Sequence, residues 1–447
     1  MSLPNTSAQG ATNMSDIVAN YKEIYGEFKD LVPAELKMSE LVKFESGMKQ
    51  MGNEFHEPVV LSMEGGVTYG GSEGSVYDLN KYVALSIKDA KVKSVEMVLR
   101  SAISVAAVSR SGSDKNSFKR ALTLLIGNMQ KSLYHRLEVA LLYGQDSIGI
   151  ANSAAVDGTD NTKINVVIKD AEWASGVWVG TNKHKVDVLN TGLSTKRAHA
   201  GVTDLIIDSY SFQTKTVVLQ AVDASGVGVA LLTTSIVNTD KIFFKGEVVA
   251  GATPEHNNMK GLKSIAETRG TLFSIANSSV PLFQGNIVDC GTDATINAAP
   301  LDFKTIEKAA AASAEKGVSN NGTSALVSVH SWNDLLTDQA AKRRYDGSEV
   351  GKLKEGAREL EFYGQTGAIA IIPSTFVKEG YAFVFNAKDL MRIGATDVTL
   401  TPPGMQGEPI RYLEEAQGYQ ARAVSDQCLF TSKPGSISVI RFVKRGV

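Results

Sequence analysis

A glycine-rich pentapeptide has the spacing of a hydrolase nucleophile. Residues 70–74, GGSEG, match the G-x-S-x-G pattern, in which a sharp strand-to-helix turn exposes a serine hydroxyl beside an oxyanion hole. That chemistry requires a helix directly after Ser72. Residues 75–80 lack the helical spacing of apolar residues, and Ser72 lies in a longer bend that is rich in glycine. We interpret the segment as a loop and keep a serine hydrolase that uses Ser72 as the alternative from another class of function.

Two other patterns are too incomplete to predict a ligand site. Residues 226–228, GVG, begin a phosphate-binding pattern, but the third glycine is missing and a strand-like run follows instead of a helix. The histidines are scattered, and none has a partner at a metal-ligand spacing; they are His56, His135, His184, His199, His256 and His330. We therefore predict no catalytic, metal or cofactor site.

The densest basic cluster lies between residues 342 and 358 and has the charge to contact phosphate. Its basic members are Lys342, Arg343, Arg344, Lys352, Lys354 and Arg358. Acidic residues are interleaved with them, namely Asp338, Asp346, Glu349 and Glu355. This mixture of charges favours a solvated or inter-subunit face over a nucleic-acid site.

Composition supports a globular chain without a strong electrostatic preference. The 447 residues are 43% hydrophobic and 21% charged, enough for roughly three domains. A formal net charge of −2 gives no global reason to bind nucleic acid or a membrane surface. The two cysteines, Cys290 and Cys428, are far apart, so we expect a reducing compartment and no disulfide framework. We expect no signal peptide and no membrane span.

The elements that must position any site begin with a long helix from Ser113 to Gly144. Apolar residues recur every three or four positions on one stripe: Phe118, Leu122, Leu125, Met129, Leu133, Leu137 and Leu141. Polar residues between them, expected on a solvated or interfacial side, include Lys131, His135 and Arg136. Gly127 indicates a close approach by another backbone, and Gly144 indicates a left-handed turn that ends the helix.

The chain before this helix lacks a core of its own. Apolar spacing predicts two short helices, over residues 17–31 and 41–51. From residue 58 to residue 110 the period changes to two, which predicts a long antiparallel ribbon with a glycine-rich bend at 64–75 and a turn at Lys88–Lys93. An isolated ribbon is marginal in water and has open edges. We expect the ribbon and the short helices to dock on neighbouring subunits.

The chain after the helix is first rich in strands and then mixed. Strand candidates separated by turn residues predict a small barrel or sandwich over residues 163–250; they are 163–170, 176–180, 185–189, 204–210, 215–223, 226–237 and 241–249. The remainder has an α/β pattern, with helices at 302–316 and 332–344 and strands at 324–330, 368–374, 381–386, 419–430 and 436–443.

This order of parts resembles the major capsid proteins of tailed double-stranded-DNA bacteriophages, with the Hong Kong 97-type fold. An N-terminal arm, an extended hairpin and a long spine helix follow one another as in that family. The helix ending LEVALLYG, residues 137–144, resembles the family's leucine-tyrosine-glycine finish. LVSVHSWNDLL, residues 326–336, resembles its strand and helix leading into the axial domain, and DKIFFKGE followed by GLKSIAE resembles the exit from an insertion domain.

The resemblance implies an α+β capsid fold with an inserted β-barrel or sandwich domain. Its parts would be an N-terminal arm (1–57), an extended β-hairpin loop (58–110), a peripheral domain with the spine helix (111–162), the inserted β-rich domain (163–250), a continuation of the peripheral domain (251–301), an axial domain (302–410) and closing peripheral strands (411–447). It further implies a structural virion protein, made in the bacterial cytoplasm, that is not an enzyme.

The same resemblance implies the partners. The chain would assemble with itself, as hexamers and pentamers, into an icosahedral shell around packaged double-stranded DNA that it contacts non-specifically. A portal and possible scaffolding or cement proteins would join it. Some family members cross-link a hairpin lysine to a neighbour's asparagine; no such asparagine can be placed here, and we predict no cross-link. The runner-up is a bacterial nanocompartment shell of the same fold around a cargo enzyme, which usually lacks the inserted β-domain.

Overall fold

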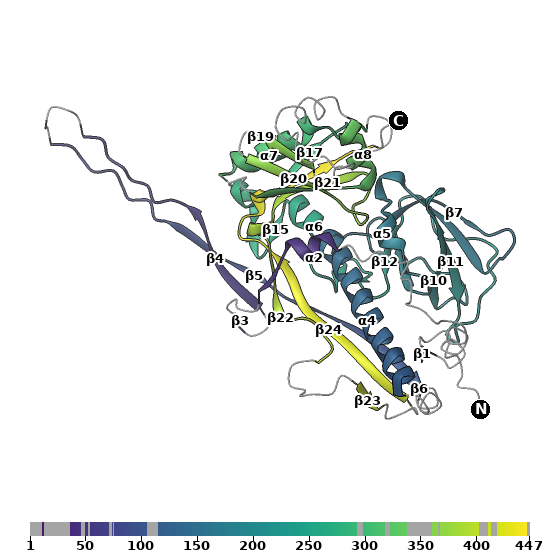
Figure 1. The fold of residues 1–447 in the computed structure, drawn as a ribbon. Helices are drawn as coiled ribbons and strands as arrows, with labels where there is room; N and C mark the ends of the chain where they lie inside the picture. The colour runs from purple at the N-terminus through teal and green to yellow at the C-terminus, as the bar shows by residue number, and fades with distance from the viewer. Residues whose placement is uncertain are drawn as a thin grey trace, which may run out of the picture.

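The computed structural model describes residues 11–12, 36–45, 50–51, 54–70, 74, 76–104, 115–292, 298–317, 322–337, 360–364, 367–401, 410–412 and 418–444. Within them the chain has the expected α+β class: one long helix, a projecting hairpin, a closed barrel and two six-stranded sheets (Figure 1). The first short helix, predicted at 17–31, and the basic residues from Lys342 to Arg358 lie outside the described residues.

The long helix α4 (Lys115–Tyr143) runs through the middle of the molecule, and its 29 residues make a rod about 44 Å long (Figure 1). Two residues of its sequence stripe, Met129 and Leu133, face a sheet, because they are buried in a cluster with Ala421 and Ala423. The glycine expectations are wrong. No atom lies within 4 Å of a Cβ placed on Gly127, and the left-handed residue after the helix is Gln145, at φ 65°. Gly144 is needed for close packing instead.

The sheet beside α4 is built from strands that are distant in the sequence. Its order is β1-β6-β24-β22-β2, and β23 also pairs with β24. The members are β1 (Ala11–Thr12), β2 (Phe44–Glu45), β6 (Val95–Ser104), β22 (Met391–Thr399), β23 (Ile410–Tyr412) and β24 (Gly418–Phe430). The long strand β24 is antiparallel to both β6 and β22. The expected closing strand at 419–430 is therefore central to this sheet.

The projecting arm is a two-stranded hairpin of β4 (Glu54–Ser62) and β5 (Ser86–Val92) (Figure 1). A short strand β3 (Gln50–Met51) pairs with the root of β4. The predicted ribbon is therefore correct in its first two strands but wrong in its third, since β6 leaves the arm to pair with β24. The predicted turn at Lys88–Lys93 is also wrong, because β5 continues as a strand to Val92.

A closed six-stranded barrel lies on the other side of α4 (Figure 1). Its strands, in the order β10-β11-β8-β7-β12-β9, are β7 (Gly149–Val156), β8 (Lys163–Ile168), β9 (Lys185–Leu189), β10 (Asp204–Ser211), β11 (Thr216–Val222) and β12 (Lys241–Phe244). Burial alternates along β8 and β11, as expected for strands with one face in a core. The barrel includes β7, which precedes the expected start at residue 163; the domain boundaries themselves remain predictions.

The second six-stranded sheet is mixed, with the order β17-β25-β21-β18-β20-β19. Its strands are β17 (Asn286–Asp289), β18 (Thr323–Val327), β19 (Leu360–Gly364), β20 (Gly367–Pro373), β21 (Tyr381–Asn386) and β25 (Ile437–Arg441). The helices α7 (Phe303–Glu315) and α8 (Val329–Thr337) pack against this sheet. The Asp302 carboxylate caps α7 by accepting the N–H of Thr305 at 2.8 Å.

Short elements complete the fold, and three sequence expectations fail among them. They are α2 (Lys37–Leu41), α5 (Ser175–Trp178), α6 (Leu262–Glu267), the 3₁₀ turn η1 (Asp170–Glu172) and the strands β13 (Val248–Val249), β14 (Glu255–His256), β15 (Thr271–Leu272) and β16 (Ile275–Ala276). The helix predicted at 41–51 stops at Leu41, because Phe44 and Glu45 pair with β22. Residues 176–178 of the strand predicted at 176–180 lie in α5 instead, and residues 226–237 contain no strand.

Candidate functional site

The arm carries the densest exposed apolar surface of the described residues. Eleven of the twenty exposed large hydrophobic residues lie between Val60 and Ile87. The most exposed are Met63 (88%), Tyr69 (90%), Val76 (103%), Leu79 (80%) and Tyr82 (91%). Monomeric proteins rarely leave an apolar patch of this kind without a partner. A two-stranded ribbon also supplies too little burial to hold itself together. The arm is therefore built as a contact surface.

The root of the arm, unlike its tip, is fixed to the body. Phe55, Ala90 and Val92 are buried in the main core. The N–H of Lys91 donates to the carbonyl of Phe273 at 2.9 Å, and the Phe273 ring packs on Phe430 with a centroid separation of 5.1 Å. The root thus sets the direction in which the arm leaves the body.

The hydrolase candidate, Ser72, falls between Gly70 and Gly74 of this arm in the sequence. Ser72 is outside the described residues, while Gly70 and Gly74 on either side of it are not. Residues 76–80 are non-helical, so the helix that a nucleophile elbow requires does not follow. The nearest described histidine along the chain, His56, lies at the arm root and contacts Asp89 through Nδ1 at 2.5 Å. The described residues next to the G-x-S-x-G segment therefore do not form the fold that a nucleophile elbow requires.

The supposedly polar side of α4 is largely buried in its C-terminal half, which corrects the sequence expectation for His135 and Arg136. His135 donates from Nε2 to the carbonyl of Gly176 at 2.7 Å. Arg136 stacks over the Phe244 ring at 3.0 Å and donates to Nδ1 of His184 at 3.2 Å. Lys131, nearer the N-terminal end, is exposed as expected. These contacts join α4 to the barrel, so both residues are packing groups inside the subunit.

These contacts also set the protonation of the residues. Burial, followed by the charge of Arg136, lowers the pKa of His184 to about 4, and burial lowers the pKa of His135. Both rings are therefore neutral at pH 7. Burial raises the pKa of Glu247, on the barrel side of Arg136, to about 7 despite the opposing charge of Arg136. The joint between α4 and the barrel is held by packing, one stacked guanidinium and neutral hydrogen bonds.

A charge-balanced cluster is buried where α4 ends, and we call it the junction; it consists of Tyr143, Asp146, Glu172, Lys263, Lys378 and Tyr381. Lys263 contacts Asp146 at 2.5 Å, and Lys378 contacts Glu172 at 2.5 Å. The Lys378 side chain has 0% exposure and also donates to the Ser147 carbonyl at 2.8 Å. The Tyr381 hydroxyl donates to Glu172 at 2.8 Å. These bonds tie α4, η1, α6 and β21 to one another.

The electrostatics of the junction indicate a structural role for its charged residues and not a catalytic one. Burial opposes ionisation of Asp146, but the ammonium groups of Lys263 and Lys378 outweigh it and lower its pKa to about 2. Burial alone would lower the pKa of Lys263, but Asp146 and Glu172 hold it well above the usual value. Asp146 and Lys263 thus stay charged and paired at pH 7. A catalytic acid or base needs a pKa near the working pH and access to substrate, and these groups have neither.

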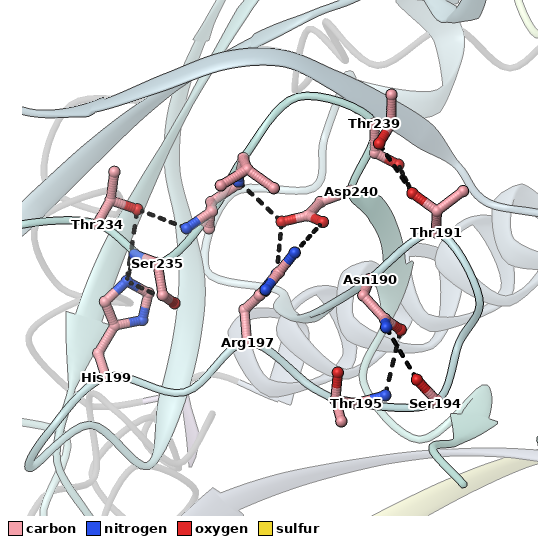
Figure 2. A network of polar contacts seen from close by, with 12 residues as sticks. Asn190, Thr191, Ser194, Thr195, Arg197, His199, Thr234, Ser235, Thr239 and Asp240 are labelled. Atoms are coloured by element: carbon pink, nitrogen blue, oxygen red, sulfur yellow. Dashed lines mark hydrogen bonds and ion pairs between the residues drawn. The ribbon is translucent and has the colours of Figure 1, made fainter. Parts of the chain in front are cut away.

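The end of the barrel holds another polar network, shown in Figure 2. Arg197 donates two hydrogen bonds to Asp240, at 2.7 and 2.8 Å, and Asp240 also accepts the N–H of Val237. Nε2 of His199 accepts the N–H of Ser235 at 3.0 Å, and the Ser235 hydroxyl lies 3.4 Å away. Among the described residues Nδ1 of His199 has no hydrogen-bond partner, so no carboxylate of this part of the chain orients the ring as in a catalytic triad. The network ties the loops at this end of the barrel together.

The described residues contain no group of three or more His, Cys, Asp or Glu residues that could hold a metal ion. No described helix combines the length and the apolar character needed to span a bilayer. Sequence reasoning missed Glu138 and the junction, because the partners of these residues are about a hundred or more positions away. One available signal was the acidic residue Glu138 inside an apolar run at the end of the helix.

Comparison with known proteins gives structural similarities at low sequence identity. No protein-family model matches the sequence, and no curated protein matches it significantly. Structurally similar chains include the cyanophage A-1(L) capsid asymmetric unit, with 13% identity, TM-score 0.49 and 94% and 95% of the two chains covered. The capsid of the native GTA particle has 8% identity, TM-score 0.46 and 95% coverage of both chains. The holo-SrpI encapsulin complex from Synechococcus elongatus has 8% identity, TM-score 0.40 and coverage of 100% and 98%.

Proposed function

We propose that this chain is the major capsid protein of a tailed double-stranded-DNA bacteriophage, a structural virion subunit that assembles into an icosahedral shell. The observation that carries the proposal is the arm. It projects from the body of the subunit (Figure 1). The side chains of Tyr69, Leu79 and Tyr82 on it are exposed, and the rest of the described chain does not cover them. The order of arm, long helix and barrel also agrees with the family resemblance in the sequence.

Burial of the arm on a neighbour supplies the driving force for assembly. Burying one large apolar side chain contributes about 1.5–3 kcal/mol. Several such residues on each arm, repeated around a symmetric ring, are enough to hold subunits together after the entropy of association is subtracted. In this proposal the subunits form hexamers and pentamers, and the body of each subunit forms part of the wall of the shell.

The remaining partners follow from the shell. Packaged double-stranded DNA would be confined by the closed shell and contacted non-specifically, which a chain with a net charge of −2 permits. A portal would occupy one opening for DNA entry, and scaffolding or cement proteins could assist assembly. No enzymatic step is part of this function, and the buried, paired charges of the junction serve to hold the fold.

Electron microscopy of the purified protein under assembly conditions tests the proposal. We expect closed shells of uniform diameter. Small monodisperse monomers under every assembly condition would contradict it. Shells purified from the native source separate the phage proposal from the nanocompartment: heads that are empty or filled with DNA support the former, and a single enclosed enzyme supports the latter. The hydrolase alternative predicts an esterase signal that Ser72→Ala abolishes.

A deletion tests the role of the arm within this function. Removing residues 64–75 shortens the projecting part without touching Phe55 or Val92 at the root. We expect the variant to keep the cooperative thermal transition of the parent subunit and to form no shells. Loss of the thermal transition would mean that the arm is needed for folding, and normal shells would mean that it is not an assembly contact.

A further inference from the structure

The strand β6 has one edge without a partner over most of its length. On one side it pairs with β24 along residues 95–104 (Figure 1). On the other side, β1 pairs with it only at Ala102 and Ile103. Residues 95–101 therefore present backbone N–H and C=O groups that no other described strand pairs. An open edge of this length is a template for pairing with another chain.

Like charges lie opposite each other at two positions of the ladder between β6 and β24. Glu96 is directly opposite Asp426. Arg100 is directly opposite Arg422. Such pairs destabilise a sheet, and Glu96 and Arg100 cannot neutralise each other because they are about 14 Å apart along the strand. Within the described part of the chain, none of these four side chains belongs to an ion pair.

The charges on the open edge are arranged symmetrically about its middle residue, Val98. Glu96 lies two positions before Val98, and Arg100 lies two positions after it. All three side chains are exposed. They lie on the face away from α4, because Met97 and Leu99 between them pack against the apolar cluster that includes α4. An antiparallel copy of the strand centred on Val98 would place its Arg100 beside Glu96.

We propose that β6 pairs with β6 of a second copy of this chain, antiparallel across a two-fold axis at Val98. The pairing continues the sheet from one subunit into the other and gives the open backbone groups hydrogen-bond partners. Each like-charge pair also gains opposite charge on its other side. The order across the joined sheet is Asp426 and Glu96 of one copy, followed by Arg100 and Arg422 of the other.

The charge pattern selects this occupant over other partners of an open edge. A nucleic acid would be repelled by Glu96 and Asp426. Charges on an edge strand commonly block pairing, but opposite signs at equal distances from Val98 convert self-pairing in one register into two ion pairs. A parallel copy in the same register would place Glu96 beside Glu96. The edge therefore specifies a second copy, its antiparallel direction and its register.

A disulfide across the two-fold axis tests the pairing in the full-length chain. Opposed residues of antiparallel strands have Cα atoms about 4.5–5.5 Å apart, which a disulfide can span. Val98→Cys should therefore link two copies under mild oxidation, with the bond mapped by peptide mass to the two introduced cysteines. Leu232→Cys, at an exposed barrel position, controls for random collision, and the parent chain controls for Cys290. A bond that forms no faster in Val98→Cys than in Leu232→Cys would overturn the proposal.

Charge reversals in the Val98→Cys background test what guides the pairing. Glu96→Arg places arginines side by side across the axis, so the disulfide should form about tenfold more slowly. Adding Arg100→Glu restores opposite charges, and the rate should return to that of Val98→Cys alone. Both reversals also turn a like-charge pair with β24 into an opposite pair, so neither should destabilise the subunit. An unchanged rate in Glu96→Arg, or no recovery in the double reversal, would overturn the proposal.

This contact deepens the proposed function, and it rests on that function for its place in a shell. Its test needs only two copies in solution, so the two proposals fail separately. Shells whose Val98→Cys subunits form no such disulfide would overturn the contact and leave the capsid proposal intact. Disulfide-linked dimers of a chain that forms no shells would support the contact and contradict the capsid proposal.

Discussion

The arm and the junction place side chains in opposite kinds of unfavourable surroundings: the arm exposes apolar side chains to water, and the junction buries charged ones in the core. The arm exposes Tyr69 and Tyr82 almost fully, while the junction buries the charged Lys378 completely. Apolar side chains in water and charges in a core both carry a free-energy cost. In the junction that cost is offset within the subunit, by Glu172 and Ser147. In the arm it is not offset by anything in the described part of the same chain.

The difference separates what folds the subunit from what the subunit does. Changes in the junction should act on the stability of the isolated chain, because its contacts are intramolecular. Changes at the arm tip should leave that stability unchanged and act on association. The four expectations below are ordered by the size of their effect on the stability of the unassembled subunit.

The largest effect is expected for Lys378→Met, which leaves Glu172 and the Ser147 carbonyl in the core without their cation. Breaking a buried pair by removing one partner costs about 3–5 kcal/mol of unfolding free energy. Denaturant unfolding of the unassembled subunit measures it. The control is Lys93→Met at the arm root, where the pair with Glu54 is exposed and should contribute less than about 1 kcal/mol. Similar losses of unfolding free energy in both variants would contradict the expected difference between the buried pair and the exposed pair.

A glycine next to the junction should tolerate no side chain. A Cβ on Gly261 would lie 2.4 Å from the nitrogen of Gly144 and 2.8 Å from the Ala140 carbonyl oxygen, so backbone must move. We expect Gly261→Ala to destabilise the subunit by about 3 kcal/mol. Gly127→Ala, with no atom within 4 Å, should instead stabilise α4 by up to about 1 kcal/mol. Thermal unfolding of both variants checks the opposite signs.

Acid should weaken the junction before it affects the arm. The pKa of Asp146 is lowered to about 2, so its ion pair stabilises the fold fully above about pH 4, and this stabilisation is lost as the pH falls toward 2. The loss should be about 2 kcal/mol. It is measured as unfolding free energy between pH 5 and pH 2, where Asp146→Asn should show a flatter dependence. Asp78→Asn, an exposed arm position, should keep the slope of the parent chain.

The smallest effect on stability is expected at the arm tip. The double substitution Tyr69→Ser and Tyr82→Ser removes two rings that are 90% and 91% exposed, so unfolding free energy should change by less than about 0.5 kcal/mol. Assembly, followed by light scattering, should nevertheless be abolished. Leu232→Ser, at an equally exposed barrel position, should change neither property. A large loss of stability in the tyrosine variant would show that the arm belongs to the subunit's own fold.

Much of the fold could be predicted because its signals are local. The repeat of apolar residues from Phe118 to Leu141 predicted α4 to within two residues at its start and one at its end. Alternation of apolar residues predicted β8, β9, β10 and β11, and Asp302 marked the start of α7. The failures occurred where pairing with a distant strand overrides local spacing, as at residues 41–51 and in β6.

The candidate functional regions show the same division between features that local sequence predicts and features that only the tertiary structure determines. The sequence alone determined that the arm is an extended ribbon too small to have a core, because alternation and glycine-rich turns are properties of neighbouring residues. Tertiary structure alone decided that His135 and Glu138 are buried, that Arg136 stacks on Phe244, that Lys378 meets Glu172, and that Glu138 accepts the N–H of Met38. The sequence around a polar residue on a helix does not reveal which element will cover its side chain. Its partner is chosen by the packing of the whole chain.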